Sequence, residues 1–254
     1  MIDLHSHVLP GLDDGAASLE EGLAILRAAA ADGIVRIAAT PHVRADYPTA
    51  PEAMERGVRE LNAAARAAGV PVEVLPGGEL DLAFAAGLDD GALARFGLGG
   101  NPSLLLLECP YHGWPLDLRD FVFRLEVRGF AAVLAHPERN PDVQGDPELL
   151  RPLVEAGVLV QITAASLDGR LGPRPLRASR TLLDAGLVHL LASDAHAPQV
   201  REVGLTAAAA AAGDEALARW LTQDVPAALV AGAALPARPA RRTRRRFGRS
   251  RTDR

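Results

Sequence analysis

The stretch Met1-Ile-Asp-Leu-His-Ser-His-Val-Leu-Pro-Gly-Leu-Asp-Asp-Gly15 opens the chain and governs how we interpret the rest of it. Residues 2–7 predict a first β-strand. Because side chains alternate across a strand, His5 and His7 point to the same face, where two imidazoles can bind one divalent metal ion. A turn rich in Gly and Asp follows at once, where a barrel enzyme keeps its active site. By itself the pair fits two surface histidines equally well, so the interpretation depends on how the later strands end.

After this turn the chain alternates between predicted helices and short apolar strands. Ser18 and Glu21 form a capping box that begins a first helix, and Gly33 ends it. Six further strands are predicted at residues 34–40, 71–75, 104–108, 130–135, 158–163 and 188–192. Helices separate them, so neighbouring strands should be parallel with crossover helices. We therefore expect an α/β fold in a single domain, residues 1–235, and an Arg-rich disordered tail at residues 236–254.

Nearly every predicted strand ends in a residue type that binds metal ions. The side chains in this position are His5, His7, His42, Glu79, Glu108, His136, Asp194 and His196. Only the sixth strand, with Gln161 and Thr163, breaks the pattern. In a closed parallel barrel the C-terminal strand ends meet at one mouth, so residues far apart in sequence would meet there. Six strand ends of the same chemical character are not independent accidents.

The chemistry of this set points to a hydrolase. Imidazole and carboxylate without thiolate favour Mn, Fe or Zn as catalytic ions. Eight or nine ligands exceed the need of one ion, so we expect two or three. Metal ions about 3.5–4 Å apart serve the hydrolysis of phosphate esters. Arg139, three residues after His136, lies where it can bind phosphate oxygens in a bidentate manner.

The composition excludes several other functions. All 27 basic residues are Arg, which excludes Schiff-base lysines, a Walker lysine and the carboxylated-lysine bridge of many amidohydrolases. Residues 1–237 hold 18 Arg against 31 acidic residues, which argues against nucleic-acid binding. The one cysteine, Cys109, precludes an internal disulfide and indicates a reducing compartment. We find no signal peptide and no apolar run near the roughly 20 residues that span a bilayer, so we expect a cytoplasmic protein.

The chain resembles the polymerase-and-histidinol-phosphatase (PHP) family in several motifs. It is especially similar to the bacterial manganese-dependent protein-tyrosine phosphatases of capsular and exopolysaccharide loci, the CpsB/YwqE type. The motifs are Ile2-Asp-Leu-His-Ser-His7 with Asp13-Asp-Gly15, Ala39-Thr-Pro-His42, Gly78-Glu79, Leu107-Glu108, Ala135-His-Pro-Glu-Arg139 and Ala192-Ser-Asp-Ala-His196. The resemblance covers about residues 1–235 and implies a distorted (β/α)7 barrel with three metal ions at its mouth. Thr163 is a departure, because many relatives carry Asn there.

The resemblance also implies a role for each motif residue. The three ions would be held by His5, His7, Glu79 and Asp194; by Glu79, Glu108 and His136; and by Asp14, His42 and His196. Arg139 and Arg201 would bind the phosphate, and we assign the catalytic set as Arg139, Arg201, His42 and His196. Manganese is the expected cofactor, with Fe or Zn as alternatives. A hydroxide bridging the metals would attack phosphorus directly, without a covalent phosphoenzyme.

The implied substrate is a phosphotyrosine protein, in particular a membrane-associated tyrosine kinase of polysaccharide export, and a homo-oligomer is an open alternative to a monomer. The closest rival function is a phosphatase of a small phosphomonoester such as histidinol phosphate. Other rivals are a metal-dependent amidohydrolase and a degenerate barrel that acts as a scaffold. Several residues are assigned local roles only. Arg44, just after His42, is a weaker candidate for binding the phosphate, and we expect it to be a solvated loop charge instead. We expect Asp13 to shape its turn and His189 to be structural, while Tyr111 and Trp114 either pack locally or contact a phosphotyrosine ring.

Overall fold

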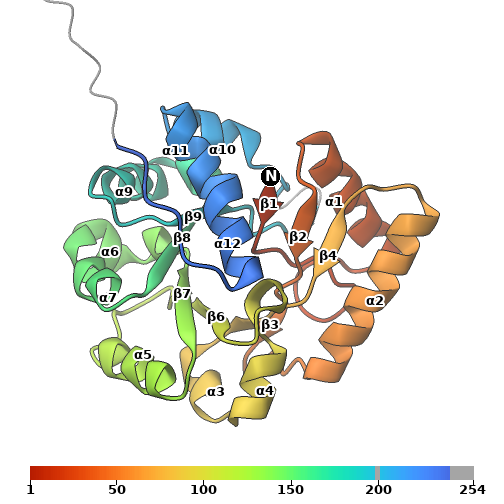
Figure 1. Ribbon diagram of the computed structural model, residues 1–254, viewed down its shortest axis with the longest axis horizontal. Helices are drawn as coiled ribbons and strands as arrows, with labels where there is room; N and C mark the ends of the chain where they lie inside the picture. The colour runs from red at the N-terminus through yellow and green to blue at the C-terminus, as the bar shows by residue number, and fades with distance from the viewer. Residues whose placement is uncertain (198–200, 241–254) are drawn as a thin grey trace, which may run out of the picture.

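The computed structural model describes residues 1–197 and 201–240, and its strands form a ring enclosed by helices (Figure 1). Two parallel sheets make up the ring, with strand orders β1-β2-β4 and β3-β5-β6-β7-β8-β9. The strands are β1 Ile2–Asp3, β2 Arg36–Ala38, β3 His42–Val43, β4 Glu73–Leu75, β5 Glu79–Leu80, β6 Leu104–Glu108, β7 Ala131–Ala135, β8 Leu159–Thr163 and β9 Leu190–Ala192. The predicted α/β fold with parallel strands is confirmed.

Two of the seven predicted strands continue past a proline into a second short strand. The strand that begins as β2 passes Pro41 and continues as β3, and β4 passes Pro76 and continues as β5. Proline has no N–H to donate to a neighbouring strand, so the sheet is interrupted at both places. These paired short strands carry His42 and Glu79 to the same level, where they are directly opposite each other in the β3–β5 register.

Backbone hydrogen bonds close the ring between its first and last strands. The N–H of Asp194 donates to the carbonyl of His5 at 2.9 Å, and the N–H of His7 donates to the carbonyl of Ala195 at 2.7 Å. Ser6 and Ala195 form a parallel bridge between them. The segment after β9 therefore lies beside the segment after β1. The last strand of the ring is thus next to the first.

Helices follow the strands around the outside of the ring. They are α1 Leu19–Ala31, α2 Pro51–Ala67, α3 Leu82–Ala86, α4 Asp90–Arg95, α5 Leu118–Val127, α6 Pro141–Gly145, α7 Arg151–Glu155, α8 Ala164–Leu167, α9 Pro173–Asp184, α10 Thr206–Ala211, α11 Glu215–Arg219 and α12 Val225–Ala231. Ser18 caps α1 as predicted, because its Oγ accepts from the N–H of Glu21 at 3.2 Å, whereas the Glu21 carboxylate accepts from the N–H of Ala17 at 2.9 Å and not from that of Ser18. Among the described residues, no helix combines the length and the apolar character needed to cross a membrane.

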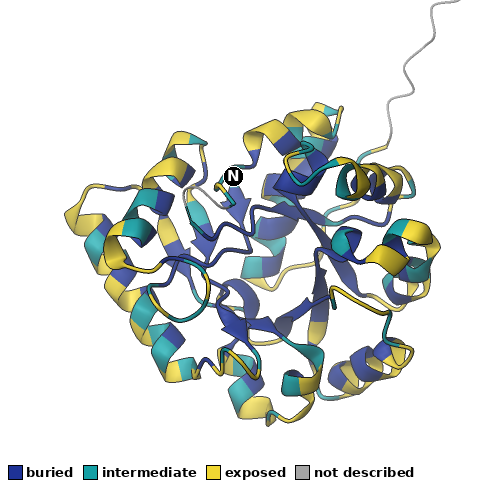
Figure 2. Cartoon of the chain, turned by 180° about the vertical axis from the view of Figure 1, so that it is seen from behind, coloured by how far each residue is buried: buried dark blue, intermediate teal, exposed yellow. Residues whose placement is uncertain are grey.

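The core lies inside the ring and between the ring and its helices. All residues of β6 and β8 are buried, as expected for parallel strands covered on both faces. Helix α12 lies across the near end of the ring in Figure 1, where it packs on β1. A Cβ at Gly99 would lie 2.8 Å from Val230 Cγ2, so α12 approaches this turn as closely as only glycine allows. Seen from the opposite side, the loops that follow the strands meet as a buried cluster at the centre (Figure 2).

The end of the described chain differs from the predicted disordered tail. Residues 236–240 pack on the outside of the barrel: Trp220 Nε1 donates to the carbonyl of Pro236 at 2.9 Å. The Arg238 guanidinium donates to the carbonyl of Leu183 at 3.2 Å and lies 5.2 Å from the centre of the Trp220 ring. The carbonyls that end α9 thus hold a cation, which composition alone did not indicate. Residues 241–254 lie outside the described residues, and the domain boundary stays a prediction.

Candidate metal centre

The structure brings together all nine side chains that were predicted as metal ligands. They form four overlapping groups, and within each group the ligand atoms lie within 4.8 Å of one another. The groups are His7, Asp14, His42 and His196; His5, Glu79 and His136; His5, His7 and Asp194; and His42, Glu79 and Glu108. Eight of the nine residues are buried, whereas the side chain of Asp14 is 44% exposed. Strand ends far apart in sequence therefore converge at one mouth.

Glu79 lies at the centre of this cluster. Its Oε1 atom is 2.7 Å from His136 Nε2, and its Oε2 atom is 3.0 Å from His42 Nδ1 and 3.4 Å from His5 Nε2. Burial alone would raise the pKa of Glu79, but His5 and His136 hold it well below its ordinary value. One carboxylate thus contacts histidines from three different strands, which is the arrangement expected of a bridging ligand.

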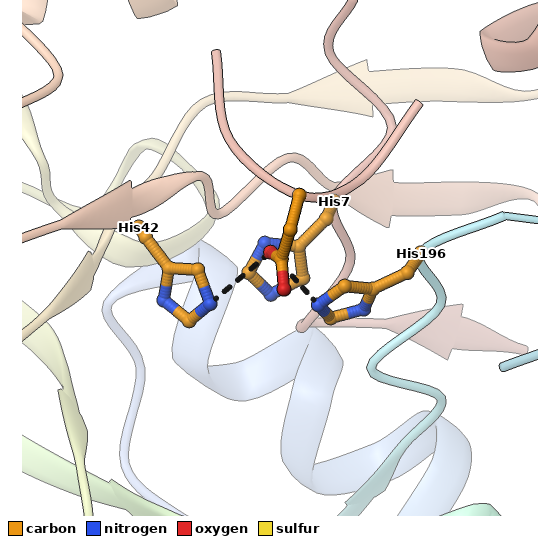
Figure 3. A group of neighbouring side chains, drawn as sticks. His7, His42 and His196 are labelled. Carbon is orange, nitrogen blue, oxygen red and sulfur yellow. Dashed lines mark ion pairs between the residues drawn. The ribbon is translucent and has the colours of Figure 1, made fainter. Parts of the chain in front are cut away.

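Asp14 connects two further histidines at the open side of the cluster. Figure 3 shows His7, His42 and His196 directed toward one another, and its two dashed lines mark the ion pairs that join His42 and His196 to Asp14. Asp14 Oδ1 lies 3.5 Å from His42 Nε2 and 3.4 Å from His196 Nε2. The rings of His7 and His196 are 3.9 Å apart between centres. The exposure of Asp14 places this side of the cluster next to solvent.

Two ligand residues are held in a backbone conformation that non-glycine residues rarely adopt. His136 has φ 40° and Asp194 has φ 52°, and they are the only described non-glycine residues with positive φ. Each follows a strand end closely, His136 after β7 and Asp194 after β9. Such conformations cost of order 1–3 kcal/mol and persist where the surroundings fix them, commonly at functional sites. The fold therefore uses strain to direct these two side chains into the mouth.

The donor atoms of the cluster fit divalent cations. His5 Nε2 and His7 Nε2 face each other at 3.2 Å. Glu79 Oε2 and His42 Nδ1 lie 3.0 Å apart but are not aligned for a hydrogen bond, and with His136 Nδ1 they are buried without a hydrogen-bond partner. Such atoms are costly to leave unsatisfied. Burial and the neighbouring Glu79 carboxylate raise the pKa of Glu108 to about 7, a sign of crowded negative charge that a cation would relieve. Imidazole and carboxylate donors without thiolate suit Mn, Fe and Zn.

Two arginines reach one carboxylate at the edge of the cluster. Arg139 Nη2 lies 2.5 Å from Asp194 Oδ2 and also donates to Thr163 Oγ1. Arg201 Nη1 lies 3.2 Å from the same Asp194 oxygen, and its Nη2 contacts His196 Nε2. The Nε atoms of both arginines are buried without a hydrogen-bond partner. The structure thus places both predicted phosphate-binding residues at the cluster, on the same carboxylate.

The comparisons with known proteins agree with this geometry. A family model described as "Capsular polysaccharide synthesis, CpsB/CapC" matches residues 1–224. The chain belongs to this family. It is 36% identical over 202 residues to the tyrosine-protein phosphatase YwqE of Bacillus subtilis, with 79% of each chain covered. It is 26% identical over 207 residues to the tyrosine-protein phosphatase CpsB of Streptococcus agalactiae, with 79% of this chain and 85% of the relative covered.

A solved structure is similar to this chain in its fold as well as in its sequence. It comes from a study of YwqE of B. subtilis and CpsB of Streptococcus pneumoniae, described as metal-dependent tyrosine phosphatases. It superimposes with a TM-score of 0.83 at 32% sequence identity, covering 95% of this chain and 100% of the other. The resemblance inferred from the motifs is therefore confirmed as membership of the CpsB/CapC family.

Sequence reasoning missed the residues that orient the ligands of this CpsB/CapC site. Asp13 was expected only to shape its turn, and it does accept from the N–H of Gly15 at 2.9 Å. Its other oxygen lies 2.6 Å from His7 Nδ1 and accepts from the N–H of His42 at 2.9 Å. Burial would lower the pKa of His7, but Asp13 raises it well above its ordinary value. Asp13 was visible in the motif, and only the three-dimensional contact separates its role from that of Asp14.

Gln161 has a similar role on the strand that broke the pattern. Its Oε1 atom lies 2.9 Å from His5 Nδ1, which turns His5 Nε2 toward Asp194 and Glu79. Gln161 is fully buried in β8. A buried amide in an otherwise apolar strand was the signal available in the sequence, because buried polar groups need partners. The sixth strand therefore contributes to the site through a histidine of the first.

Among the residues expected to have local roles, Arg44 differs from its prediction. Its guanidinium is not a solvated loop charge: Nη1 lies 3.1 Å from Glu108 Oε1, and Nε lies 2.8 Å from Asp46 Oδ1. His189 lies at the opposite end of its strand, where its Nδ1 accepts from the N–H of Val160 at 3.1 Å. Burial lowers the pKa of His189 to about 4. His189 thus has structural contacts, as expected, and Arg44 belongs to the mouth.

Proposed function

We propose that this protein is a metal-dependent protein-tyrosine phosphatase that hydrolyses phosphotyrosine in a protein substrate. The observation that carries the proposal is the convergence of nine imidazole and carboxylate side chains with two arginines in the barrel mouth. Membership of the CpsB/CapC family supports the same activity, since the relative YwqE is named a tyrosine-protein phosphatase. We keep the alternative of a small phosphomonoester, such as histidinol phosphate, as an outcome of the test.

We infer that the nine side chains hold two or three ions. The proposed sets are His5, His7, Glu79 and Asp194; Glu79, Glu108 and His136; and Asp14, His42 and His196. Two observed groups support the first and third sets: His5, His7 and Asp194 lie together, and so do Asp14, His42 and His196, with His7 beside them. Glu79 lies with His5 and His136 in one group and with His42 and Glu108 in another, so the second set draws its members from two groups. Manganese is the proposed metal, with Fe and Zn as alternatives. When bound, such ions polarise phosphoryl oxygens and activate water at neutral pH.

The arginines of the chain would bind and orient the phosphoryl group. Arg139 is fixed by Asp194 and Thr163, and its side chain is only 8% exposed, so its charge is little screened by water. Both guanidinium groups lie at Asp194 beside the cluster, and a guanidinium is suited to bidentate contact with phosphate oxygens. Because both guanidinium groups are held before substrate arrives, little side-chain freedom is lost on binding.

The low pKa of a phenol, compared with an aliphatic alcohol, makes a phenolic phosphate ester the easier one to hydrolyse. Tyrosine has a pKa near 10, so its oxygen leaves with less assistance than an aliphatic alcohol would need. A cysteine nucleophile is not part of the proposal. Cys109 is buried, burial raises its pKa, and Pro115 stands where a Cys-x5-Arg loop would carry arginine. We therefore propose direct transfer of the phosphoryl group to water without a phosphoenzyme.

The proposed cellular substrate is a membrane-associated tyrosine kinase of polysaccharide export. The phosphatase would act on it in the cytoplasm. This follows from the capsular polysaccharide synthesis family to which the chain belongs. A homo-oligomer remains compatible with the proposal.

The decisive experiment compares hydrolysis of a phosphotyrosine peptide and of histidinol phosphate, each with Mn, Fe or Zn. His136→Ala and Arg139→Ala should each lower kcat/KM on the peptide at least about a hundredfold, a loss typical of removing a group that acts in the transition state. Arg59→Ala, which removes an exposed arginine of α2, is the matched control and should leave the rate unchanged. Faster turnover of histidinol phosphate would support the alternative, and unaffected rates in both site variants would contradict the site.

A further inference from the structure

The chain has only two tyrosines, and both lie against histidines of the metal centre. The Tyr47 ring lies 5.9 Å from the His42 ring at an interplanar angle of 20°. The Tyr111 ring lies 5.8 Å from the His136 ring at an angle of 21°. In a chain with 4% aromatic residues, this placement calls for a reason beyond core packing.

The two rings approach the centre from different sides of Glu79. His42 contacts one oxygen of this carboxylate and His136 contacts the other, at 3.0 Å and 2.7 Å. Tyr47 therefore stacks on one histidine and Tyr111 on another, and the two histidines share the Glu79 carboxylate. Tyr111 remains 40% exposed, so part of its surface is accessible from the mouth.

Tyr111 is also linked to the arginine that we assign to phosphate. Its hydroxyl lies 3.4 Å from Arg139 Nη1. The loop that carries Tyr111 is tied to the turn that carries Arg139: Asn140 Nδ2 donates to the carbonyls of Pro110 at 2.7 Å and Gly113 at 3.1 Å. Asn140 is buried, and its Oδ1 also caps α6. The distance between the Tyr111 ring and the Arg139 guanidinium is thus fixed by one amide.

Tyr47 is held just as firmly on the other side. Arg44 and Tyr47 exchange two backbone hydrogen bonds of 3.1 Å, and Val43 and Pro48 form an antiparallel bridge around them. The guanidinium of Arg44 lies 5.3 Å from the centre of the Tyr47 ring while it also pairs with Glu108. A tight hairpin therefore fixes this ring against both a histidine and a cation.

We infer that Tyr47 and Tyr111 each offer an aryl contact beside the metal centre, and that these contacts make it prefer aryl over alkyl phosphomonoesters. The inference rests on the proposed function and specifies its substrate class. A phenyl ring bound at the mouth can pack on tyrosine faces at centre distances of 4.5–7 Å, a gain that an aliphatic chain does not receive. The hydrogen bonds from Asn140 to the loop of Tyr111 hold the ring at a fixed position relative to Arg139. Tyr47 and Tyr111 are specificity-determining residues in this account.

The test measures two ligand classes on the metal-loaded protein. In the binding arm, calorimetry compares a peptide that carries phosphonomethyl-phenylalanine with the same peptide that carries an aliphatic phosphonate. In the activity arm, the substrates are matched phosphotyrosine and phosphoserine peptides. Tyr111→Leu should weaken binding of the aryl peptide roughly five- to tenfold and lower its kcat/KM mainly through KM, while the aliphatic ligand changes less than about twofold.

Two further variants separate this role from support of the histidines. Tyr111→Phe keeps the ring and should keep the aryl preference, whereas Tyr47→Leu should lower it. Phe123→Leu removes an exposed aromatic ring of α5 and serves as the control. Metal content of every variant is measured by mass spectrometry and should equal that of the wild type.

Equal weakening of both ligand classes, or a loss of metal that accounts for the change, would overturn the inference. If the wild-type protein fails to hydrolyse the phosphotyrosine peptide, the proposed function is wrong. The binding arm still tests the contacts of Tyr47 and Tyr111 with an aryl ligand in that case, so the two failures are distinguishable.

Discussion

Asp13 Oδ2 lies 2.6 Å from His7 Nδ1, a carboxylate–imidazole contact directly behind the metal centre. Such a contact fixes the tautomer and orientation of the ring, so that Nε2 is the atom presented to a cation. Here the opposite nitrogen of His7 lies 3.3 Å from Asp194 Oδ1. Asp13 therefore determines which atom of His7 the site uses, although it belongs to none of the four ligand groups.

From this contact we predict that Asp13→Asn lowers metal affinity about 10- to 100-fold, the range seen when a partner of a ligating histidine is lost. The substitution keeps size but removes the negative charge that raises the pKa of His7. Chelator competition followed by metal analysis measures the effect. Asp120→Asn, at an exposed position of α5, is the control. Wild-type affinity in Asp13→Asn would show that the turn, and not the carboxylate, positions His7.

Gln161 supports a second prediction, on the neighbouring histidine. Gln161→Leu has a similar volume but removes the side-chain oxygen that His5 Nδ1 contacts at 2.9 Å, and it leaves that nitrogen buried. We expect metal affinity to fall about tenfold, and the free energy of unfolding of the metal-free protein to change by no more than about 1–3 kcal/mol. Gln161→Glu keeps an acceptor at the same place and should retain more affinity than the leucine variant. If leucine and glutamate behave alike, orientation of His5 is not the reason.

The barrel and the convergence of the ligands could be predicted from the sequence because both follow from local patterns. Apolar runs that end in His, Glu or Asp mark the strands and the mouth together, and parallel pairing then brings the ends into one place. Asp13, Gln161 and Arg44 could not be assigned in this way, because their partners are 6, 156 and 64 residues away. A side chain's hydrogen-bond partner depends on tertiary distance, which a strand-end pattern does not contain.

Tertiary contacts that sequence patterns do not contain also explain why residues 236–240 differ from the predicted disorder. Residues from 236 onward are rich in Pro and Arg, a composition typical of disorder, yet Arg238 meets the carbonyls that end α9. We predict that Arg238→Ala lowers the free energy of unfolding by roughly 1–3 kcal/mol, since it removes charge-assisted hydrogen bonds and the contact with Trp220. Chemical denaturation measures this loss, and kcat should not change because the site is elsewhere. A stability equal to wild type would mean that residues 236–240 contribute no net stabilisation.

Metal removal gives a fourth prediction. The cluster gathers buried carboxylates and imidazoles whose atoms lack partners, so a cation bound only in the folded state should stabilise the fold. At a metal concentration about 100 times Kd, one site contributes about 2.7 kcal/mol, and EDTA should lower Tm accordingly. Glu79→Gln should reduce the difference in Tm between metal-loaded and chelated protein, because Glu79 contacts four of the histidines. A wild-type Tm that does not respond to EDTA would contradict a folded-state metal centre.

His189 gives a pH-dependent prediction that is independent of the metal centre. Burial, followed by the nearby Arg238 charge, lowers the pKa of His189 to about 4 in the folded protein, against an ordinary value of 6.5. Between these values the unfolded chain binds more protons at this residue than the folded protein does. The folded state should therefore lose stability as pH falls from about 6.5 to about 4, by at most roughly 3 kcal/mol from this group.

The variant that isolates this effect is His189→Asn, whose side-chain oxygen can still accept from the N–H of Val160 as Nδ1 does at 3.1 Å. Urea unfolding of both proteins in EDTA, between pH 4.5 and 7.5, gives the comparison, because protonation of the metal ligands is then common to both. We expect the wild-type protein to lose stability relative to His189→Asn as pH decreases, with most of the change below pH 6.5. A difference that stays constant across this range would show that His189 titrates alike in the folded and unfolded chains, and that its burial against Trp220 does not exclude the proton.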